Sequence, residues 1–277
     1  MDYIQNIIIK NYRMGVIRLY KFTNYSFLLK RLVYIIRKIQ DNIQYYFLDT
    51  ESIDIGNVIK TSKLDLKKII GDKKYESKWL NVLSKLEKLE LGKNTGGITE
   101  IDQEILYKLI KGYNRKKILE IGTHIGSSTV AIAMALKSGQ NKQLITVDIN
   151  NVNSRNEEIW LSFESKNSPE KNLEKLNLQN YVKFVVSDSK KYMTNTKNKF
   201  DFIFLDGDHR TKSTYNDIIL SINLLEKNGI LVLHDYTDNN YLSSIAGPVL
   251  AVKKLRQKNN TLKIKLFKNS SLALISR

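Results

Sequence analysis

The sequence predicts an α/β fold in which a doubly wound, mostly parallel sheet of seven strands follows an N-terminal helical extension. Five short apolar runs occur after residue 116, and most are followed by a turn and a helical segment. Polar and acidic residues stand directly after these runs. Residues 1–95 have only four glycines, no proline and apolar residues at helical spacing. Strands that alternate with helices are typical of doubly wound sheets, whose ligands bind at the carboxyl ends of the strands.

Composition narrows the classes of function. The chain has 277 residues, enough for one large core and an extension. The net charge of +17 is spread along the chain as lysine, while arginine is sparse. This favours a lysine-rich background over a nucleic-acid interface. The chain has no cysteine, which excludes disulfides and thiolate sites and favours a cytoplasmic location. We find no secretory signal pattern and no apolar run approaching the roughly 20 residues of a membrane span.

The N-terminal extension begins with a basic amphipathic stretch, Tyr25–Ile39. Peripheral contact of this stretch with an anionic membrane is one interpretation. The alternative is packing on the catalytic domain or in a homodimer, because Leu32–Ile36 is apolar on all sides. Residues 61–92 are expected to form further helices, with three side chains in the core: Trp79, Leu80 and Leu83.

A domain boundary is predicted at Gly96-Gly97, which separates the extension (residues 1–95) from residues 96–277. Thr99 and Asp102 resemble a capping box that starts a helix over Glu100–Lys111. This helix leads into the first strand.

The first strand, Ile118–Ile121, carries Glu120 and is followed by Gly122 and Gly126. The Ser127-Ser128-Thr129 segment then begins a helix of small residues. A strand, a glycine turn and a helix N-terminus together expose backbone N–H groups to a ligand. We therefore expect a ligand-binding βα unit here.

The second strand, Gln143–Val147, ends at Asp148, whose carboxylate is suited to bind the two hydroxyls of a ribose. Residues 150–167 form an expected insertion on the loop side of the sheet. Its Trp160 and Phe163 are expected to pack or, as an alternative, to cover a substrate. Ser168 and Pro169 then start a helix, as N-cap and first residue.

The remaining elements continue the alternation of strands and helices. A turn at Asn228-Gly229 is expected before the fifth strand, and a helix over Val249–Leu255 after it. The third, fourth and fifth strands and the final hairpin are predicted at Val182–Val186, Phe200–Leu205, Ile230–Leu233, Leu262–Phe267 and Leu272–Ile275.

Titratable residues gather at the predicted carboxyl ends of the strands. All three histidines of the chain follow a strand, and five aspartates do the same. Parallel strands bring these ends to one edge, so the sequence predicts a functional site there. The residues are His124, His209, His234, Asp148, Asp188, Asp206, Asp208 and Asp235.

From about residue 97 the chain resembles the class I S-adenosylmethionine-dependent methyltransferases, which share a Rossmann-like fold. It is most similar to small-molecule O-methyltransferases of the catechol and macrocin types that carry an Asp-Gly-Asp-His motif. The segments that carry the resemblance are EIGTHIGSST (120–129), VDIN (147–150), VVSDS (185–189), FIFLDGDH (202–209) and LVLHDY (231–236).

The resemblance implies S-adenosylmethionine as cofactor, magnesium or another divalent cation, and a hydroxyl of a small molecule or glycan as acceptor. The implied cofactor-binding residues are Glu120, Gly122, Thr123, Gly126, Ser128, Asp148, Asp188 and Ser189. The implied metal ligands are Asp206, His234 and Asp235. The implied catalytic residues are Asp208, His209 and His234.

Two positions depart from the family pattern. His234 stands where macrocin-type enzymes have another carboxylate, and magnesium prefers oxygen ligands. Thr211 stands where close relatives often have tyrosine. Two mechanisms therefore stay open. In one, a metal activates the acceptor hydroxyl while Asp208 or His209 takes its proton. In the other, His209 or His234 acts as base without a metal.

Three alternative functions were weighed. A nicotinamide-dependent oxidoreductase is disfavoured because His124 occupies the place of the middle glycine of G-x-G-x-x-G. Methylation of nucleic acid is disfavoured because the chain lacks cysteine and an Asn-Pro-Pro-Tyr-type tetrapeptide. A membrane-associated binding protein without turnover is the third alternative, and the intact acidic edge argues against it.

Overall fold

The computed structural model describes residues 27–89, 91, 97–137, 139–236 and 247–277, and of residues 27–34 it describes the backbone alone. The chain divides into two compact units, Met1–Gln40 and Asp41–Arg277. The sheet, its flanking helices and all the predicted site residues belong to the second unit.

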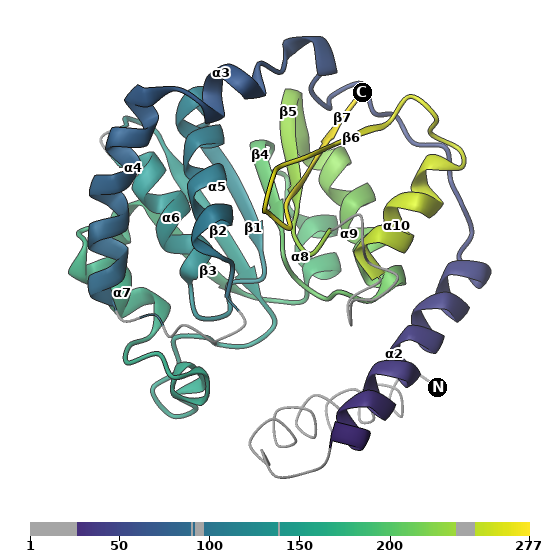
Figure 1. Ribbon diagram of the computed structural model, residues 1–277, viewed down its shortest axis with the longest axis horizontal. Coiled ribbons are helices and arrows are strands. Elements are labelled where there is room, and N and C mark those ends of the chain that lie inside the picture. Colours follow the sequence, from purple (N-terminus) through teal and green to yellow (C-terminus); the bar gives the residue numbers. More distant parts are fainter. Residues whose placement is uncertain (1–26, 90, 92–96, 138, 237–246) are drawn as a thin grey trace. The chain divides into compact units, whose positions relative to one another are not determined.

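Seven strands form one sheet in the order β3-β2-β1-β4-β5-β7-β6 (Figure 1). The first five strands pair in parallel, and β7 runs antiparallel to both of its neighbours, β5 and β6. The predicted doubly wound, mostly parallel sheet of seven strands is confirmed. The strands are β1 (Lys117–Ile121), β2 (Gln143–Asp148), β3 (Val182–Val186), β4 (Phe200–Leu205), β5 (Leu225–Leu233), β6 (Lys263–Leu266) and β7 (Ala273–Ser276).

Helices cover both faces of this sheet, with α5 and α6 on one face and α8, α9 and α10 on the other (Figure 1). Neighbouring strand residues therefore enter opposite cores: Ile118 joins the α5–α6 core and Leu119 the α9–α10 core. The α-helices are α2 (Phe27–Phe47), α3 (Leu66–Ile70), α4 (Lys73–Leu86), α5 (Glu100–Gly112), α6 (Ser127–Leu136), α7 (Pro169–Lys175), α8 (Ser189–Asn195), α9 (Thr211–Leu224) and α10 (Gly247–Arg256).

Part of the N-terminal segment is built into the second compact unit. Val58 bridges to Gly229 of β5, and the Ile59 amide donates to the Gly229 carbonyl at 3.0 Å. Trp79 of α4 is buried, as expected, and Leu83 packs against the same core. Leu80 was expected in the core but is 60% exposed, because α4 turns this position to solvent. The boundary predicted between residues 95 and 96 remains a prediction.

The extended β5 replaces the turn that was expected at Asn228-Gly229. The pairing of β4 with β5 shifts between Phe200 and Phe202, which leaves a bulge in β5 before Ile230. Asn228 adopts the left-handed conformation with φ of 61°. The Gly229 amide donates to the Asn57 carbonyl at 3.0 Å, so this part of β5 is paired with residues 57–59 and is not a free turn.

Helix α2 contains the described part of the amphipathic stretch that the sequence predicts at Tyr25–Ile39. Tyr25 lies outside the described residues. Ile35 and Ile36 are 44% and 42% exposed in the single chain, and the packing expected for this part of the stretch remains a prediction. No helix among the described residues has both the length and the apolar character of a membrane span.

The last turns of α2 cap the N-terminus of α9 from outside that helix. The residue at the N-cap position, Arg210, supplies no side-chain cap. Instead, the Asp41 carboxylate accepts from the Thr211 amide at 3.0 Å and from the Thr211 hydroxyl at 3.1 Å. The Gln44 side chain accepts from the Lys212 amide at 3.0 Å. Thr211, one of the two departures from the family pattern, is therefore the residue of α9 that Asp41 of α2 contacts.

Replacing Asp41 with alanine is expected to lower the free energy of unfolding by about 1–2 kcal/mol, the usual cost of a lost N-cap, because Asp41 and Thr211 are both buried. Urea unfolding of the full chain measures this change. Asp65→Ala is the matched control, since Asp65 caps α3 at an exposed site and should cost less. Equal losses in the two variants would contradict a special role for Asp41.

Candidate active site

The glycine turn after β1 lies directly against the loop after β4. Gly122 has φ of 95°, and a Cβ atom there would lie 2.1 Å from the Asp206 carbonyl oxygen. Gly126 has φ of 81° and occupies the N-cap of α6, where no side chain caps the helix. Only glycine fits Gly122 without displacing the β4 loop. The first N–H groups of α6 are thus available to an anionic ligand group.

Asp148, at the end of β2, is bound to the same turn. Its Oδ2 accepts from the amides of Thr123 at 3.1 Å and His124 at 3.0 Å. Its Oδ1 accepts from the Asn150 amide at 2.9 Å. A carboxylate has about four lone-pair positions, so these three amides leave Oδ1 with one position for a ribose hydroxyl.

Glu120 and Ser128, both predicted to bind the cofactor, are buried beneath this turn. The Glu120 side chain is fully buried, and its Oε2 accepts from the Thr129 hydroxyl at 2.6 Å. Burial raises the pKa of Glu120 to about 7, although bonds from Ser128 and Thr129 oppose the rise. Thr123 pairs its hydroxyl with that of Thr146 at 2.6 Å. These contacts support the turn from below.

Asp188 and Ser189 mark the edge of the site beyond β3. Asp188 is exposed and caps α8 by accepting from the Lys191 amide at 2.9 Å. The Ser189 hydroxyl donates to Asp217 at 2.9 Å. Asp217 is 5% exposed, and burial raises its pKa to about 7. Sequence reasoning missed Asp217, because a lone aspartate within α9 carries no signal of burial.

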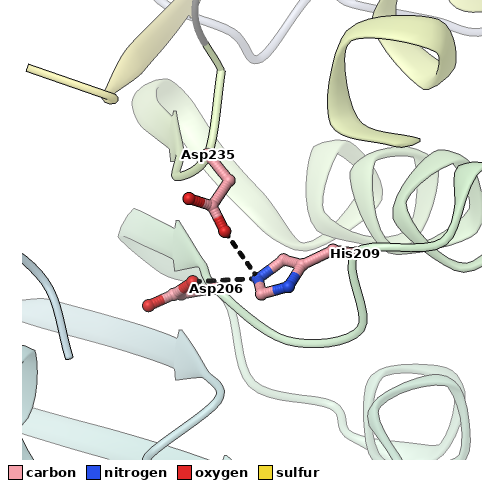
Figure 2. Close-up of side chains that lie close together, drawn as sticks. All are labelled: Asp206, His209 and Asp235. Atoms are coloured by element: carbon pink, nitrogen blue, oxygen red, sulfur yellow. Dashed lines mark hydrogen bonds and ion pairs between the residues drawn. The ribbon is translucent and has the colours of Figure 1, made fainter. Parts of the chain in front are cut away.

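Asp206, His209 and Asp235 converge where β4 and β5 end (Figure 2). The His209 Nε2 atom lies 3.3 Å from Asp206 Oδ1 and 3.1 Å from Asp235 Oδ2. One ligand atom from each residue lies within 4.8 Å of the others. We call these three residues the acidic cluster. All three are partly exposed, so an acceptor can reach them.

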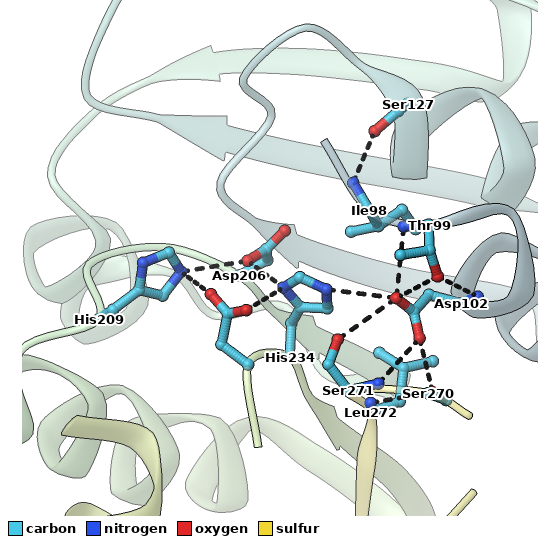
Figure 3. Close-up of polar contacts among 11 residues, drawn as sticks. Ile98, Thr99, Asp102, Ser127, Asp206, His209, His234, Ser270, Ser271 and Leu272 are labelled. Carbon is cyan, nitrogen blue, oxygen red and sulfur yellow. Dashed lines mark hydrogen bonds and ion pairs between the residues drawn. The ribbon is translucent and has the colours of Figure 1, made fainter. Parts of the chain in front are cut away.

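His234 lies behind the acidic cluster and contacts three carboxylates. Its Nδ1 is 2.9 Å from Asp206 Oδ1 and 3.5 Å from Asp235 Oδ1, and its Nε2 is 3.5 Å from Asp102 Oδ2 (Figure 3). Burial alone would lower the pKa of His234, but these carboxylates raise it well above its usual value. Burial likewise favours a neutral Asp206, but His234 and His209 hold the pKa of that carboxyl well below its usual range.

Asp208 faces away from the position that a general base would need. Its carboxylate pairs with the Arg210 guanidinium, where Nε donates at 2.6 Å, and accepts from the Ser213 hydroxyl at 2.9 Å. These bonds outweigh burial and lower the pKa of Asp208. A carboxylate held in this way is a weak base. The predicted catalytic role of Asp208 remains a prediction, and the geometry favours His209.

The insertion after β2 reaches the site through one aromatic contact. The Phe163 and His124 rings meet edge to face, with centroids 4.3 Å apart. His124 has φ of 50°, and burial lowers its pKa despite the nearby Asp148 and Asp206. Trp160 is 9% exposed and packs, as the sequence favours. The alternative in which Phe163 covers a substrate remains a prediction.

Asp102 lies beside the site, although the sequence indicated only its part in a capping box. The capping box with Thr99 is confirmed, with the Asp102 amide donating to the Thr99 hydroxyl at 3.2 Å. The Asp102 carboxylate also contacts the ring of His234, the residue that follows β5. Nothing in the sequence indicates this second contact, because it depends on the fold bringing α5 beside the end of β5.

The donor set of the acidic cluster fits a divalent cation. Two carboxylates and one imidazole suit manganese or zinc at least as well as magnesium, which prefers oxygen alone. The grouping differs from the predicted metal ligands, since His209 takes the place of His234. The uncapped α6 and the Asp148 carboxylate fit the carboxylate and the ribose of S-adenosylmethionine, respectively.

The cavity beside α2 is separate from this site. It measures about 480 Å³ and lies between the end of α2 and the outer face of α9, lined in part by Ile43, Phe47, Tyr215 and Ile219. None of the predicted site residues lines it.

Residues 119–236 match the model of a methyltransferase domain. This match, which covers less than half of the chain, bears out the expected resemblance to methyltransferases. No curated protein matches the chain in sequence.

Solved structures show the likeness of fold. The S-adenosylhomocysteine-bound methyltransferase PaMTH1 of Podospora anserina is 15% identical, with a TM-score of 0.50 and coverage of 77% of this chain and 97% of its own. An O-methyltransferase of Bacillus cereus in complex with S-adenosylhomocysteine is 18% identical, with a TM-score of 0.47 and coverage of 73% and 91%. The O-methyltransferase TomG of Streptomyces achromogenes, in complex with S-adenosylmethionine, is 15% identical, with a TM-score of 0.46 and coverage of 77% and 100%.

Proposed function

We propose that the methyltransferase domain of this chain transfers a methyl group from S-adenosylmethionine to a hydroxyl of a small molecule or glycan, with a divalent cation assisting. One observation carries the proposal. The glycine turn that fits the methyl donor touches the loop that holds the acidic cluster, since Gly122 lies against the carbonyl of Asp206. A donor on the turn and an acceptor at the cluster would therefore be neighbours.

The donor side of the proposed site uses three features of the chain. The open N-terminus of α6 favours a carboxylate, and Asp148 accepts from a ribose hydroxyl. Asp188, exposed beyond β3, is proposed to lie near the adenine. Asp148 also holds the amides of Thr123 and His124, so the turn keeps its shape before the donor binds.

The acceptor side must align a hydroxyl and remove its proton. The oxygen forms a bond to the methyl carbon while the carbon–sulfur bond of the donor breaks and its electron pair stays on sulfur. The acceptor proton passes to a base, and in the arrangement without a metal the His209 imidazole is proposed to take it on the ring nitrogen that does not face Asp206 and Asp235. Asp206 and Asp235 orient this imidazole and stabilise its charged form.

In the metal-assisted arrangement, Asp206, His209 and Asp235 would hold the cation, which would orient a bound hydroxyl and lower its pKa, so that the hydroxyl proton would pass to water. The proposal favours this arrangement because the three ligand atoms already converge. Only the donor set indicates which ion binds. Because one donor is an imidazole, manganese or zinc suits the cluster at least as well as magnesium.

A calorimetric titration of the full chain with S-adenosylhomocysteine tests the proposal. We expect saturable binding, and no binding of NAD⁺, because His124 occupies the place of the middle glycine that a dinucleotide needs. The titration is repeated with added Mg²⁺ or Mn²⁺. Absence of binding to both S-adenosylhomocysteine and S-adenosylmethionine would contradict the proposed function.

A further inference from the structure

Asp102 is a fully buried carboxylate that belongs to a helix cap and also faces the active site. It stands in the first turn of α5, before β1, whereas His234 follows β5. Figure 3 shows the Asp102 carboxylate between the Thr99 cap, the serines of the β6–β7 turn and the His234 ring. A helix cap needs a single hydrogen-bond acceptor, whereas the Asp102 carboxylate accepts hydrogen bonds from several groups.

The additional bonds fix the direction of the carboxylate. Oδ1 accepts from the Ser270 hydroxyl at 2.5 Å and from the Ser271 amide at 3.2 Å. Oδ2 accepts from the Thr99 hydroxyl at 2.7 Å and lies 3.5 Å from His234 Nε2. With its lone pairs engaged on the side of the cap and the hairpin, the carboxylate cannot turn away from His234.

The His234 ring needs such a partner to keep its orientation. Asp206 stands on the Nδ1 side of the ring at 2.9 Å, and Asp102 stands on the Nε2 side. A ring flipped by 180° would present carbon atoms to both carboxylates, at the cost of both polar contacts. The Phe204 ring, edge to face with a centroid distance of 6.3 Å, borders the imidazole from the core.

The contact between Asp102 and His234 also explains why a histidine suits position 234, where the chain departs from the family pattern. A carboxylate at position 234 would face Asp102 as well as Asp206, and three buried carboxylates without a counter-charge would repel one another. An imidazole at this position instead links the two aspartates. His234 and Asp102 are thus compatible with each other in a way that a second carboxylate and Asp102 are not.

We propose that Asp102 is a positioning residue, which holds the His234 ring with Nδ1 toward Asp206 and thereby arranges the acidic cluster for a divalent cation. The inference rests on the proposed function for its metal. Partners that hold a histidine beside a metal typically change metal affinity 10- to 100-fold when they are removed.

The first test compares Mn²⁺ binding in Asp102→Asn and in the wild-type chain, by electron paramagnetic resonance of free Mn²⁺. Asparagine keeps the shape of the side chain but removes its charge, and we expect about 10-fold weaker binding. Affinity for S-adenosylhomocysteine should stay within about two-fold in the same variant, because the described contacts of the Asp102 side chain run to Thr99, to the serines of the β6–β7 turn and to His234. Thr99→Val is the matched control, since it removes one cap bond from the same carboxylate and leaves Asp102 facing His234. It should lower thermal stability without changing Mn²⁺ affinity. Equal loss of Mn²⁺ affinity in both variants would mean that Asp102 acts only as a cap, and would overturn the inference.

The second test needs neither metal nor acceptor. The chain has three histidines, so long-range ¹H–¹⁵N spectra resolve each ring, and His234→Gln assigns the signal of interest. We expect the same His234 ring shifts in wild type and Thr99→Val, and a changed Nε2 shift in Asp102→Asn, because Asp102 stands 3.5 Å from that nitrogen. An unchanged signal in Asp102→Asn would refute the inference. If wild type binds no Mn²⁺, the metal part of the proposed function fails, and these spectra still decide whether Asp102 orients His234.

Discussion

Replacing Asp206 with asparagine is expected to lower methyl transfer by about a thousand-fold, the range in which positioned acid–base groups and metals contribute. Asp206 contacts both His209 and His234, as Asp235 does, and its Oδ1 makes the shorter contact with His234 Nδ1, at 2.9 Å. The amide keeps its shape but removes the charge that stabilises a protonated His209 or a bound cation. Formation of S-adenosylhomocysteine, with any hydroxyl acceptor that the wild-type chain methylates, measures the loss.

The variant should retain its affinity for S-adenosylhomocysteine within a few-fold, because the methyl donor is proposed to bind at the turn after β1. Asp201→Asn is the matched control on the same strand. Asp201 stands at the opposite end of β4, where its carboxylate accepts from the amides of Lys116 and Lys117. This variant should lose stability and keep its turnover. Full activity in Asp206→Asn with excess chelator would refute both proposed roles of Asp206.

Replacing Asp148 with alanine is expected to weaken binding of S-adenosylhomocysteine by at least about 100-fold, which corresponds to about 2.7 kcal/mol. A hydrogen bond from a ribose hydroxyl to a carboxylate contributes roughly 1.5–3 kcal/mol. The substitution also frees the amides of Thr123 and His124, so the turn loses the acceptor that shapes it. Calorimetry on the full chain measures the change.

Asp188→Ala provides the comparison for this result. Asp188 follows β3 as Asp148 follows β2, and in the structure it caps α8 at an exposed position. We expect only a few-fold weaker binding, because a neutral base offers fewer donors than a ribose diol. A larger loss in Asp188→Ala than in Asp148→Ala would move the ribose to the end of β3 and contradict the assignment of Asp148.

Local patterns in the sequence were enough to predict most of the elements. The capping box at Thr99, the Ser168-Pro169 helix start and the glycine turn at Gly122 all appear where expected, because a cap or a turn depends on a few adjacent residues. The predictions that failed depended on distant partners. Asn228-Gly229 became a bulge because residues 57–59 pair with it, and Leu80 is exposed because α4 buries a different face.

The sequence by itself determined that histidines and aspartates would gather at the carboxyl edge of a parallel sheet, since the ends of the strands follow from the apolar runs and parallel strands bring these ends to one edge. Only the tertiary structure decided how they pair. It placed His209 between Asp206 and Asp235, bound Asp208 to Arg210, and brought Asp102 to His234 from a helix more than a hundred residues away. Pairing depends on side-chain directions and on distances of a few ångströms between elements. Those are set by how helices pack on the sheet, which no local pattern encodes.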